Sequence, residues 1–350
     1  MTAVAQNNHG SPGMQHYRVV VTQHGGPDVL QVMEEDIPDP QAGEVRVKVL
    51  AAGVSALDAQ FRRSGSLPGS PRVPFTPGED IVGVVDKLGE GVSSVEPGQM
   101  VATYLFGPRG GYAEFICRPA SELVPVPQGL DPAEAVCLVT NYPTAHLYLH
   151  QTACVRSGER ILVHGAAGGV GTALLQLGNL AGLEMYGTAS KYNHELVSSL
   201  GATPIDYRTE DFVERIHSLT GDGVDAVFDL IGGARHLWRS YRSLRKGGRV
   251  VLMGSIAISK DGLRVIPLSV LTILLIKVIP DSKRAPLSPK FPSTHNAWYH
   301  ETLTEILDLA AAGRIKPVVA ERVPLAEAAR AHELLEHGGH SGKVVLVTGE

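Results

Sequence analysis

The stretch RILVHGAAGGVGTALLQLGNLA, residues 160–181, decides the fold of this chain of 350 residues. Residues 160–163 are mostly apolar and are typical of a buried strand. Residues 165–171 form a turn of small residues. Residues 172–181 carry leucines at spacings that suit a helix packed on a sheet. Strand, glycine turn and helix in this order make up a dinucleotide-binding unit.

The glycines of this turn carry the chemistry of the unit. A helix N-terminus offers unpaired N–H groups and a partial positive charge to a pyrophosphate. Gly168 lets the backbone approach the phosphates, and Gly171 lets the helix pack close to the strand. Ala166 stands where the usual G-x-G-x-x-G pattern has its first glycine. The pattern predicts a nucleotide site, with a plain buried strand–helix turn as the alternative.

The next expected strand, residues 183–188, indicates which nucleotide binds. In NAD-binding units an acid about 20 residues past the last glycine bonds the ribose 2′-hydroxyl. Here that place holds Ser190 and Lys191, and no acid. A hydroxyl and an ammonium attract a 2′-phosphate, which a carboxylate would repel. We therefore expect NADPH rather than NADH, with two surface residues at a strand end as the alternative.

Strands and helices continue to alternate after this unit. Helices are expected at residues 195–200, 211–219 and 235–244, strands at 204–207, 225–230 and 249–253, and a turn at 246–248. Gly201 is expected to stop the first of these helices. Gly254 and Ser255 follow a strand, at the edge where open α/β sheets bind ligands. The alternation predicts a doubly wound parallel sheet.

The chain up to about residue 130 predicts a mostly β domain. Strands are expected at residues 17–23, 45–51, 82–88 and 100–105, between turns rich in glycine and proline. A helix is expected over residues 133–139, with Asp131 as its cap and Pro132 at its first position. The polar residues 1–16 are expected to form a loose tail. Near the other end, a helix (300–312), a strand (318–323), a helix (325–335) and a last strand (342–347) are expected.

The composition and net charge of the chain limit the classes of function that it can have. The chain has 31 Lys and Arg against 36 Asp and Glu, a net charge of −5, which gives no electrostatic case for nucleic acid or anionic lipid. A hydrophobic fraction of 43% suits a packed core, and the length suits about two domains. The first 16 residues lack an apolar run, so we expect no signal peptide.

Seven stretches of the sequence stand in the order that one superfamily shares. They are TPGEDIVGVV around Gly78 and Glu79, GYAE at 111–114, VPQGL at 126–130, the AAGGVG turn, IDY at 205–207, FDLIGG at 228–233 and LRKGGRVVLMG at 244–254. On these residues the chain resembles the medium-chain dehydrogenase/reductase superfamily, in the zinc-independent branch that holds quinone oxidoreductases, enoyl reductases and vesicle-associated proteins. The resemblance is more specific for the fold and the nucleotide site than for the substrate.

The resemblance implies an α/β fold with two domains. A doubly wound parallel-sheet (Rossmann) domain is expected over residues 140–300, with an apolar insert at about 260–300. A mostly β, GroES-like catalytic domain is expected over residues 17–139 and 301–350. The segment 141–149 resembles the one that crosses between the two domains, with a plain inter-domain helix as the alternative.

The resemblance also implies the site residues. The catalytic surface is expected to include Ser55 and Asp58; the branch commonly has Asn at the position of Ser55, and Ser can still donate one hydrogen bond to a carbonyl oxygen. For Asp58 the alternative is an acid at a helix N-terminus. The cofactor residues are expected to be Asn141, Thr144, Ala167, Gly168, Gly169, Val170, Gly171, Ser190, Lys191, Tyr207, Gly254 and Ser255. For Lys343 two alternatives are expected: a position near the cofactor, or an ordinary turn before the last strand.

A zinc site is not expected. Zinc alcohol dehydrogenases have a Cys at about the position of Ser55 and a His near that of Gly78, and this chain has neither. It also lacks the four-cysteine lobe that binds structural zinc. Its three cysteines, Cys117, Cys137 and Cys154, show no metal or disulfide pattern, which suits a reducing cytoplasm.

The segment VIPLSVLTILLIKVI, residues 265–279, is unusually apolar. It is short for a membrane span and contains Pro267 and Lys277. Three interpretations stay open: a lid over the substrate, a contact in a dimer, or a patch that touches a membrane surface. The proline-rich residues 283–293 are expected to form a mobile loop.

Together these features predict a cytoplasmic, homodimeric enzyme that transfers hydride from NADPH to a small-molecule acceptor without zinc. The acceptor is a quinone or an α,β-unsaturated carbonyl, and the nicotinamide supplies the chemistry. One alternative is an enoyl reductase that acts on an intermediate of a biosynthetic pathway. Another is a non-catalytic, membrane-associated protein that binds NADPH.

Overall fold

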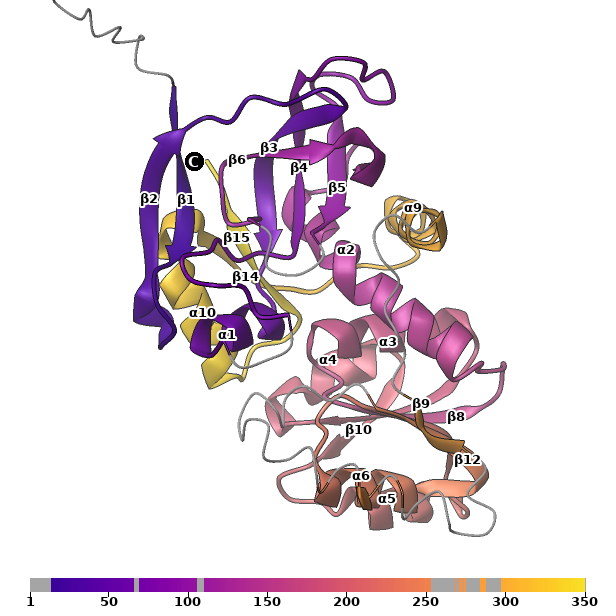
Figure 1. The fold of residues 1–350 in the computed structure, drawn as a ribbon. Coiled ribbons are helices and arrows are strands. Elements are labelled where there is room, and N and C mark those ends of the chain that lie inside the picture. Colours follow the sequence, from indigo (N-terminus) through magenta and orange to yellow (C-terminus); the bar gives the residue numbers. More distant parts are fainter. Residues whose placement is uncertain are drawn as a thin grey trace, which may run out of the picture.

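The computed structural model describes residues 14–65, 69–105, 110–252 and 297–349, with residues 268, 271, 272 and 274 and the backbone of Arg284–Leu287. Gly254, Ser255 and most of the apolar segment 265–279 lie outside the described residues. Figure 1 shows two sheets at opposite ends of the molecule, with helix α2 (Pro132–His146) between them.

One sheet has six parallel strands in the order β10-β9-β8-β11-β12-β13. With β8 counted as the first strand, this order is 3-2-1-4-5-6, the doubly wound order of dinucleotide-binding folds. It confirms the predicted sheet. The strands are β8 (Arg160–His164), β9 (Glu184–Ala189), β10 (Ala202–Asp206), β11 (Val224–Asp229), β12 (Leu244–Leu252) and β13 (Arg284–Leu287).

Helices cover both faces of this sheet (Figure 1). They are α3 (Gly169–Leu180), α4 (His194–Ser199), α5 (Phe212–Thr220) and α6 (Ala234–Arg242), with the single turn η4 (Lys191–Asn193). Successive side chains of β8 pack on opposite faces of the sheet. Ile161 packs in the cluster that contains Leu174 of α3, whereas Leu162 packs with Phe212 of α5 and Leu237 of α6. The strand is therefore buried on both sides, as its apolar sequence requires.

The other sheet has seven strands, with the main order β14-β15-β3-β4-β5-β7 and β6 paired to β3. Strands from the end of the chain thus complete a sheet that the first part begins. The strands are β3 (Glu44–Gly53), β4 (Asp80–Leu88), β5 (Met100–Tyr104), β6 (Phe115–Pro119), β7 (Val124–Pro125), β14 (Val319–Pro324) and β15 (Lys343–Val347). A separate hairpin joins β1 (Gln15–Val21) and β2 (Leu30–Asp36). The short helices are α1 (Ala56–Arg63), α10 (Ala328–His337), η1 (Pro27–Val29), η2 (Ala120–Glu122) and η6 (Leu325–Glu327).

Helix α2 extends beyond the expected helix at residues 133–139 into the segment 141–149, for which a plain inter-domain helix was the alternative. Asp131 caps it as expected, since its side chain accepts the N–H of Glu134 at 3.0 Å. The helix then continues through Pro143 to His146 and widens into the π-helical turn η3 (Leu147–Thr152). Proline removes the N–H that would bond the carbonyl four residues earlier. The hydroxyl of Tyr299, on α9 (Ala297–Ala311), donates to that carbonyl, Val139 O, at 3.0 Å.

Several other boundaries differ from prediction. The strand β1 begins at Gln15, inside the expected tail. Helix α3 begins at Gly169, three residues early, because Gly168 takes the N-cap position. Residues 246–248 were expected as a turn, but β12 runs through them with an irregular register beside β11. Arg284–Leu287 falls in the expected loop and pairs with β12 as a strand. Residues 325–335 divide into η6 and α10.

Candidate nucleotide and acceptor site

The glycine turn leaves the N-terminus of α3 open. No side chain caps the helix, and its first turn holds no acid. A Cβ atom added at Gly168 would meet only the carbonyl oxygen of Gly165, at 3.4 Å, so the protein leaves space in front of this residue. At Gly171 the added atom would lie 2.2 Å from the same oxygen, because helix and strand pack closely there. The turn thus has the geometry that a pyrophosphate needs.

Two strands place the predicted 2′-phosphate residues side by side. Ala189 and Asp206 are register partners at the ends of β9 and β10. Ser190 and Lys191 follow the first strand, and Tyr207, 54% exposed, follows the second. The guanidinium of Arg208 lies 5.8 Å from the centre of the Tyr207 ring. The sequence reasoning missed Arg208, although a second cation next to the tyrosine was visible in the sequence.

Of the two predicted residues on helix α2, the structure places Asn141, but not Thr144, against the glycine turn. The amide nitrogen of Asn141 lies 2.5 Å from the place where a Cβ of Gly169 would stand, so this side chain rests against the turn. The hydroxyl of Thr144 instead donates to Thr140 O at 2.6 Å, within the helix. Its oxygen can still accept a hydrogen bond, but its proton is in use.

Ser55 and Asp58 form a capping box at the start of α1. The Ser55 hydroxyl oxygen accepts the N–H of Asp58, and the Asp58 carboxylate accepts the N–H of Ser55, both at 3.0 Å. Asp58 is therefore the helix N-terminal acid that the sequence left as an alternative. It is also fully buried, and its second oxygen accepts the N–H of Gly78 at 2.9 Å.

A buried hydrogen-bonded chain supports Asp58 from behind. The Tyr112 hydroxyl lies 3.5 Å from the Asp58 carboxylate and 3.1 Å from Nε2 of His332. Arg62 donates to Nδ1 of His332 at 3.2 Å and pairs with Glu336. Because Nδ1 accepts, the neutral ring carries its proton on Nε2 and donates to Tyr112. Every described partner of the Asp58 carboxylate is thus a donor, which favours its ionised form.

Glu79 is a further buried acid of this site. It belongs to the motif around Gly78, but the sequence alone indicated no role for it. Its Oε2 accepts the Ser55 hydroxyl at 2.9 Å, and its side chain is 4% exposed. Burial, together with the nearby charges of Asp58 and Asp80, raises the pKa of Glu79 to about 8, against the lowering effects of the Ser55 hydrogen bond and of Lys343. Burial also raises the pKa of Asp58, to about 6, against the effect of its hydrogen-bond donors.

Lys343 is a partner of this cluster rather than a turn residue. It begins β15, is 5% exposed, and forms a buried ion pair with Asp80, which also accepts the Thr140 hydroxyl at 2.8 Å. Burial disfavours the charged ammonium, but Asp80 outweighs that and raises the pKa of Lys343. The preceding N–H, of Gly342, donates to Ala167 O at 2.8 Å, in the glycine turn. The acid cluster and the nucleotide turn therefore meet at β15.

The donor set of this cluster does not fit zinc. Structural and catalytic zinc sites use thiolates and imidazoles, with carboxylates as minor ligands. Here the positions offer a serine hydroxyl and acids already bonded to donors or to Lys343. Across the described part of the chain, no group of three His, Cys, Asp or Glu side chains has the geometry to hold a metal ion.

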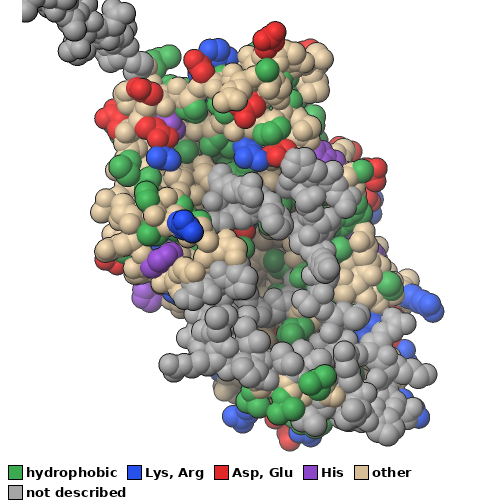
Figure 2. All heavy atoms as spheres, viewed as in Figure 1, with side chains coloured by type: hydrophobic (Ala, Val, Ile, Leu, Met, Phe, Trp, Pro, Cys, Tyr) green, Lys and Arg blue, Asp and Glu red, His purple; other side chains and the backbone are tan. Residues whose placement is uncertain are grey.

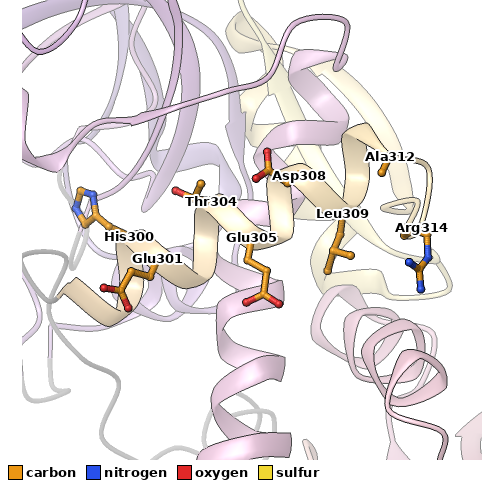
Figure 3. A pocket seen from close by; sticks show the side chains of 8 residues that line it. All are labelled: His300, Glu301, Thr304, Glu305, Asp308, Leu309, Ala312 and Arg314. Carbon is orange, nitrogen blue, oxygen red and sulfur yellow. The ribbon is translucent and has the colours of Figure 1, made fainter.

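A depression of about 690 Å³ on the outer side of α9 is a different feature. Figure 3 shows its lining side chains along one side of the helix, among them the acids Glu301, Glu305 and Asp308. Carboxylates repel phosphates, so this surface does not suit a dinucleotide. None of its lining residues belongs to the glycine turn or to the acid cluster.

The fold and the site together define a class of protein. A doubly wound sheet with a glycine turn, joined to a β domain that supplies a serine and buried acids, is the arrangement of a medium-chain dehydrogenase/reductase. Residues 41–128 match the family model "Alcohol dehydrogenase GroES-like domain", and residues 200–346 match "Zinc-binding dehydrogenase". The side chains of the described acid cluster do not offer the ligands that the zinc of the second description would need.

Comparison with individual proteins shows to which branch of this superfamily the chain is similar. The chain is 33% identical to the quinone oxidoreductase of Rattus norvegicus over 336 residues, which cover 93% of this chain and 96% of that protein. It is 31% identical over 238 residues to the synaptic vesicle membrane protein VAT-1 homolog-like of Homo sapiens, covering 68% of this chain and 56% of that protein. The structure of a mycobacterial protein complexed with NADPH superposes with a TM-score of 0.82 at 31% identity, covering 95% and 99% of the two chains.

The chain therefore belongs to the quinone oxidoreductase-like branch of the medium-chain dehydrogenase/reductase superfamily. It is an oxidoreductase of a family that uses a nicotinamide cofactor and small-molecule substrates. Lys and Arg side chains lie among Asp and Glu side chains on the part of the face that Figure 2 draws in colour. Within the described ranges, no helix is both long and apolar enough to cross a membrane.

Proposed function

We propose that this protein transfers hydride from NADPH to a quinone or an α,β-unsaturated carbonyl, without zinc. The observation that carries the proposal is the hydrogen bond from Gly342 to Ala167 O, at 2.8 Å. It joins the glycine turn to the strand that carries Lys343, whose partner Asp80 follows Glu79, the acceptor of the Ser55 hydroxyl. This contact supports a single site in which the nucleotide and the acceptor meet.

The residues of the glycine turn would hold the pyrophosphate through the backbone N–H groups at the start of α3. Asn141, beside Gly169, would contact the nicotinamide half, and Ser190, Lys191 and Tyr207 would hold the 2′-phosphate. The reduced nicotinamide supplies a hydride when it is bound. The protein contributes orientation, by holding the acceptor carbon about 3–3.5 Å from the donor carbon. It also contributes a hydrogen-bond donor, Ser55, for the acceptor oxygen on which negative charge develops.

The first experiment is NADPH oxidation, followed by absorbance of the reduced nicotinamide, with a panel of quinones, enones and enoyl thioesters and with NADH as the control. We expect turnover with quinones or enones and a preference for NADPH. Turnover with enoyl thioesters alone would favour the pathway enoyl reductase. NADPH binding without turnover on any acceptor would contradict the proposal and favour the non-catalytic alternative, which the similarity to a vesicle membrane protein also raises.

Replacement of Lys191 with glutamate should reverse the cofactor preference. The change removes a cation from the end of β9 and places a carboxylate next to the 2′-phosphate. A hydrogen bond to a charged group contributes about 1.5–3 kcal/mol. The Kd for NADPH should therefore rise about tenfold or more, while that for NADH changes little. Fluorescence titration with both nucleotides measures the ratio.

The matched control is Lys48→Glu, which makes the same charge change at an exposed position of β3, in the other sheet. It should leave both dissociation constants unchanged. An unaltered NADPH-to-NADH ratio in Lys191→Glu would show that the 2′-phosphate is bound elsewhere, with Arg208 as the next residue to change.

A further inference from the structure

Glu79 is a buried acid whose side chain makes a single described hydrogen bond. Its Oε2 accepts the Ser55 hydroxyl at 2.9 Å, and in the described structure its Oε1 has no hydrogen-bond partner although it is shielded from solvent. Native proteins rarely leave a buried carboxylate oxygen unsatisfied. A neutral carboxyl group needs less hydrogen bonding than a carboxylate, so this environment suits the protonated acid.

The charges around Glu79 place the proton on it rather than on its neighbours. Within the described residues three buried carboxyl groups share one buried cation: Asp58 on α1, Glu79 itself, Asp80 on β4 and Lys343 on β15. Lys343 pairs with Asp80, and Asp58 accepts only from donors. Glu79 pairs with no cation in the described structure, and only one of its two oxygens, Oε2, has a hydrogen-bond partner.

Among the described residues, the neighbouring tyrosines and His332 are neutral, and Arg62 is paired with an acid of its own. Burial raises the pKa values of Tyr104 on β5 and Tyr112, so both phenols are neutral. Burial lowers the pKa of His332 to about 3, so this ring is neutral as well. Arg62 forms an ion pair with Glu336. The charge balance of the cluster therefore depends on the proton of Glu79.

The hydrogen bonds of Ser55 then determine where its own proton points. A serine hydroxyl has one proton to donate and two lone pairs that accept. The N–H of Asp58 takes one lone pair, at 3.0 Å. If Glu79 is protonated, the 2.9 Å contact between Ser55 Oγ and Glu79 Oε2 reverses its direction: the Glu79 O–H donates to the second lone pair, and the Ser55 proton is free for another oxygen. Ser55 is also only half-buried, whereas the three acids are buried.

We propose that Glu79 and Ser55 form a proton relay that protonates the oxygen of the acceptor when hydride is delivered. The inference rests on the proposed function, because the relay requires an acceptor oxygen beside Ser55. Hydride reduces the acceptor by two electrons and leaves an oxyanion, an enolate or the anion of a hydroquinone. The Ser55 O–H bond breaks as the proton moves to this oxyanion, and the Glu79 proton replaces it on Oγ. Glu79 becomes a carboxylate and takes up a proton from water after the product leaves.

The direction of the pKa shifts agrees with this assignment. Burial raises the pKa of Glu79 to about 8 and that of Asp58 to about 6, so at neutral pH the first is protonated and the second is ionised. Above about pH 8 Glu79 loses its proton before the reaction begins. The rate of turnover should therefore fall as the pH rises through this value, because the relay starts without its acid.

The test compares kcat, KM and their pH dependence in Glu79→Gln and in the wild type. A glutamine N–H can still donate to the Ser55 oxygen, but it cannot supply a proton. General acid catalysis contributes about 10²-fold or more, so kcat should fall by about that factor while KM and the Kd for NADPH stay within about twofold. The decline in rate above pH 8 should disappear. A merely structural role for Glu79 would leave that decline in place.

Ser55 provides the second pair of variants. Ser55→Ala breaks the relay and should lower kcat as Glu79→Gln does, whereas Ser55→Thr keeps the hydroxyl and the cap and should recover most of the rate. If Glu79→Gln does not fold, the pH profiles of this pair decide the question: with the relay, the decline in rate above pH 8 disappears in Ser55→Ala and persists in Ser55→Thr, whereas a Ser55 that acts without Glu79 leaves the decline unchanged in both. The control Thr103→Val removes a buried hydroxyl without a described partner on the adjacent strand β5 and should change neither kcat nor its pH profile.

A third measurement detects the proton without turnover. An acid whose pKa is raised from 4.5 in the unfolded chain to about 8 in the folded one gives stability that is complete below pH 4.5 and lost as the pH rises toward 8. Glu79→Gln should remove this part of the pH dependence in urea unfolding. Wild-type turnover together with full activity and an unchanged profile in Glu79→Gln would overturn the relay alone. Absence of turnover by the wild type with any acceptor would overturn the proposed function and the relay together.

Discussion

Valine in place of Gly168 is expected to abolish the binding of both NADPH and NADH. The residue stands at the N-cap of α3 with ordinary extended dihedral angles, φ −78° and ψ 175°, so valine can adopt its backbone conformation. The new side chain would occupy the space where a pyrophosphate approaches the helix. Each lost hydrogen bond to a charged group costs about 1.5–3 kcal/mol, so the loss of two weakens binding by about a hundredfold or more. Isothermal titration with each nucleotide measures this.

The control for this change is Gly171→Ala, which tests packing instead of ligand access. An alanine Cβ there would lie 2.2 Å from Gly165 O, so the helix must move away from β8 and the protein should lose stability. At Gly168 the first added atom meets that oxygen at 3.4 Å, an ordinary contact, so the thermal midpoint without nucleotide should change little. Retention of nucleotide affinity in a folded Gly168→Val protein would refute the assignment of this turn.

The nucleotide unit could be predicted from the sequence because its determinants are local. The strand, the glycines and the helix between residues 160 and 181 lie next to one another in the chain, and their order alone indicates the strand–turn–helix geometry. The cofactor preference was predicted from a local feature as well: Ser190 and Lys191 directly follow β9, where NAD-binding units have an acid. The structure confirms the order of the strands and places Ser190 and Tyr207 on adjacent strand ends.

The acid cluster could not be predicted because its members come from distant parts of the chain. Lys343 and Asp80 are 263 residues apart, and only the return of β15 beside β3 brings them together. Glu79 was visible in the motif around Gly78, and an acid before the apolar run IVGVV suggests burial. Its partner, however, is fixed by the fold and not by the spacing of the motif.

Helix α2 shows a local rule overridden by a distant residue. Proline normally ends or kinks a helix, yet α2 continues past Pro143 to His146. In the structure the carbonyl that Pro143 leaves unbonded receives the hydroxyl of Tyr299 from α9. A contact across the fold thus replaces the missing backbone hydrogen bond, and α2 reaches from the acid cluster, through Thr140, to the glycine turn, through Asn141.

Removal of Lys343 is expected to have the largest effect on stability. Lys343→Met leaves the Asp80 carboxylate buried without its cation, with only the Thr140 hydroxyl as a described donor. Loss of one partner of a buried ion pair costs about 3–5 kcal/mol, which is a large part of the total stability of about 5–15 kcal/mol for a typical domain. Urea unfolding at neutral pH measures the loss.

The double variant Asp80→Asn with Lys343→Met separates the ion pair from simple packing. Asparagine is neutral and can still accept the hydroxyl of Thr140, so no buried charge remains. Because a buried ion pair replaced by neutral groups is often nearly neutral in stability, the double variant should be more stable than Lys343→Met alone, and the two changes should be strongly non-additive. Additive losses would show that the two side chains act independently. Since Gly342 bonds the glycine turn next to Lys343, the single variant should also bind NADPH more weakly, and the double variant should recover this affinity together with its stability.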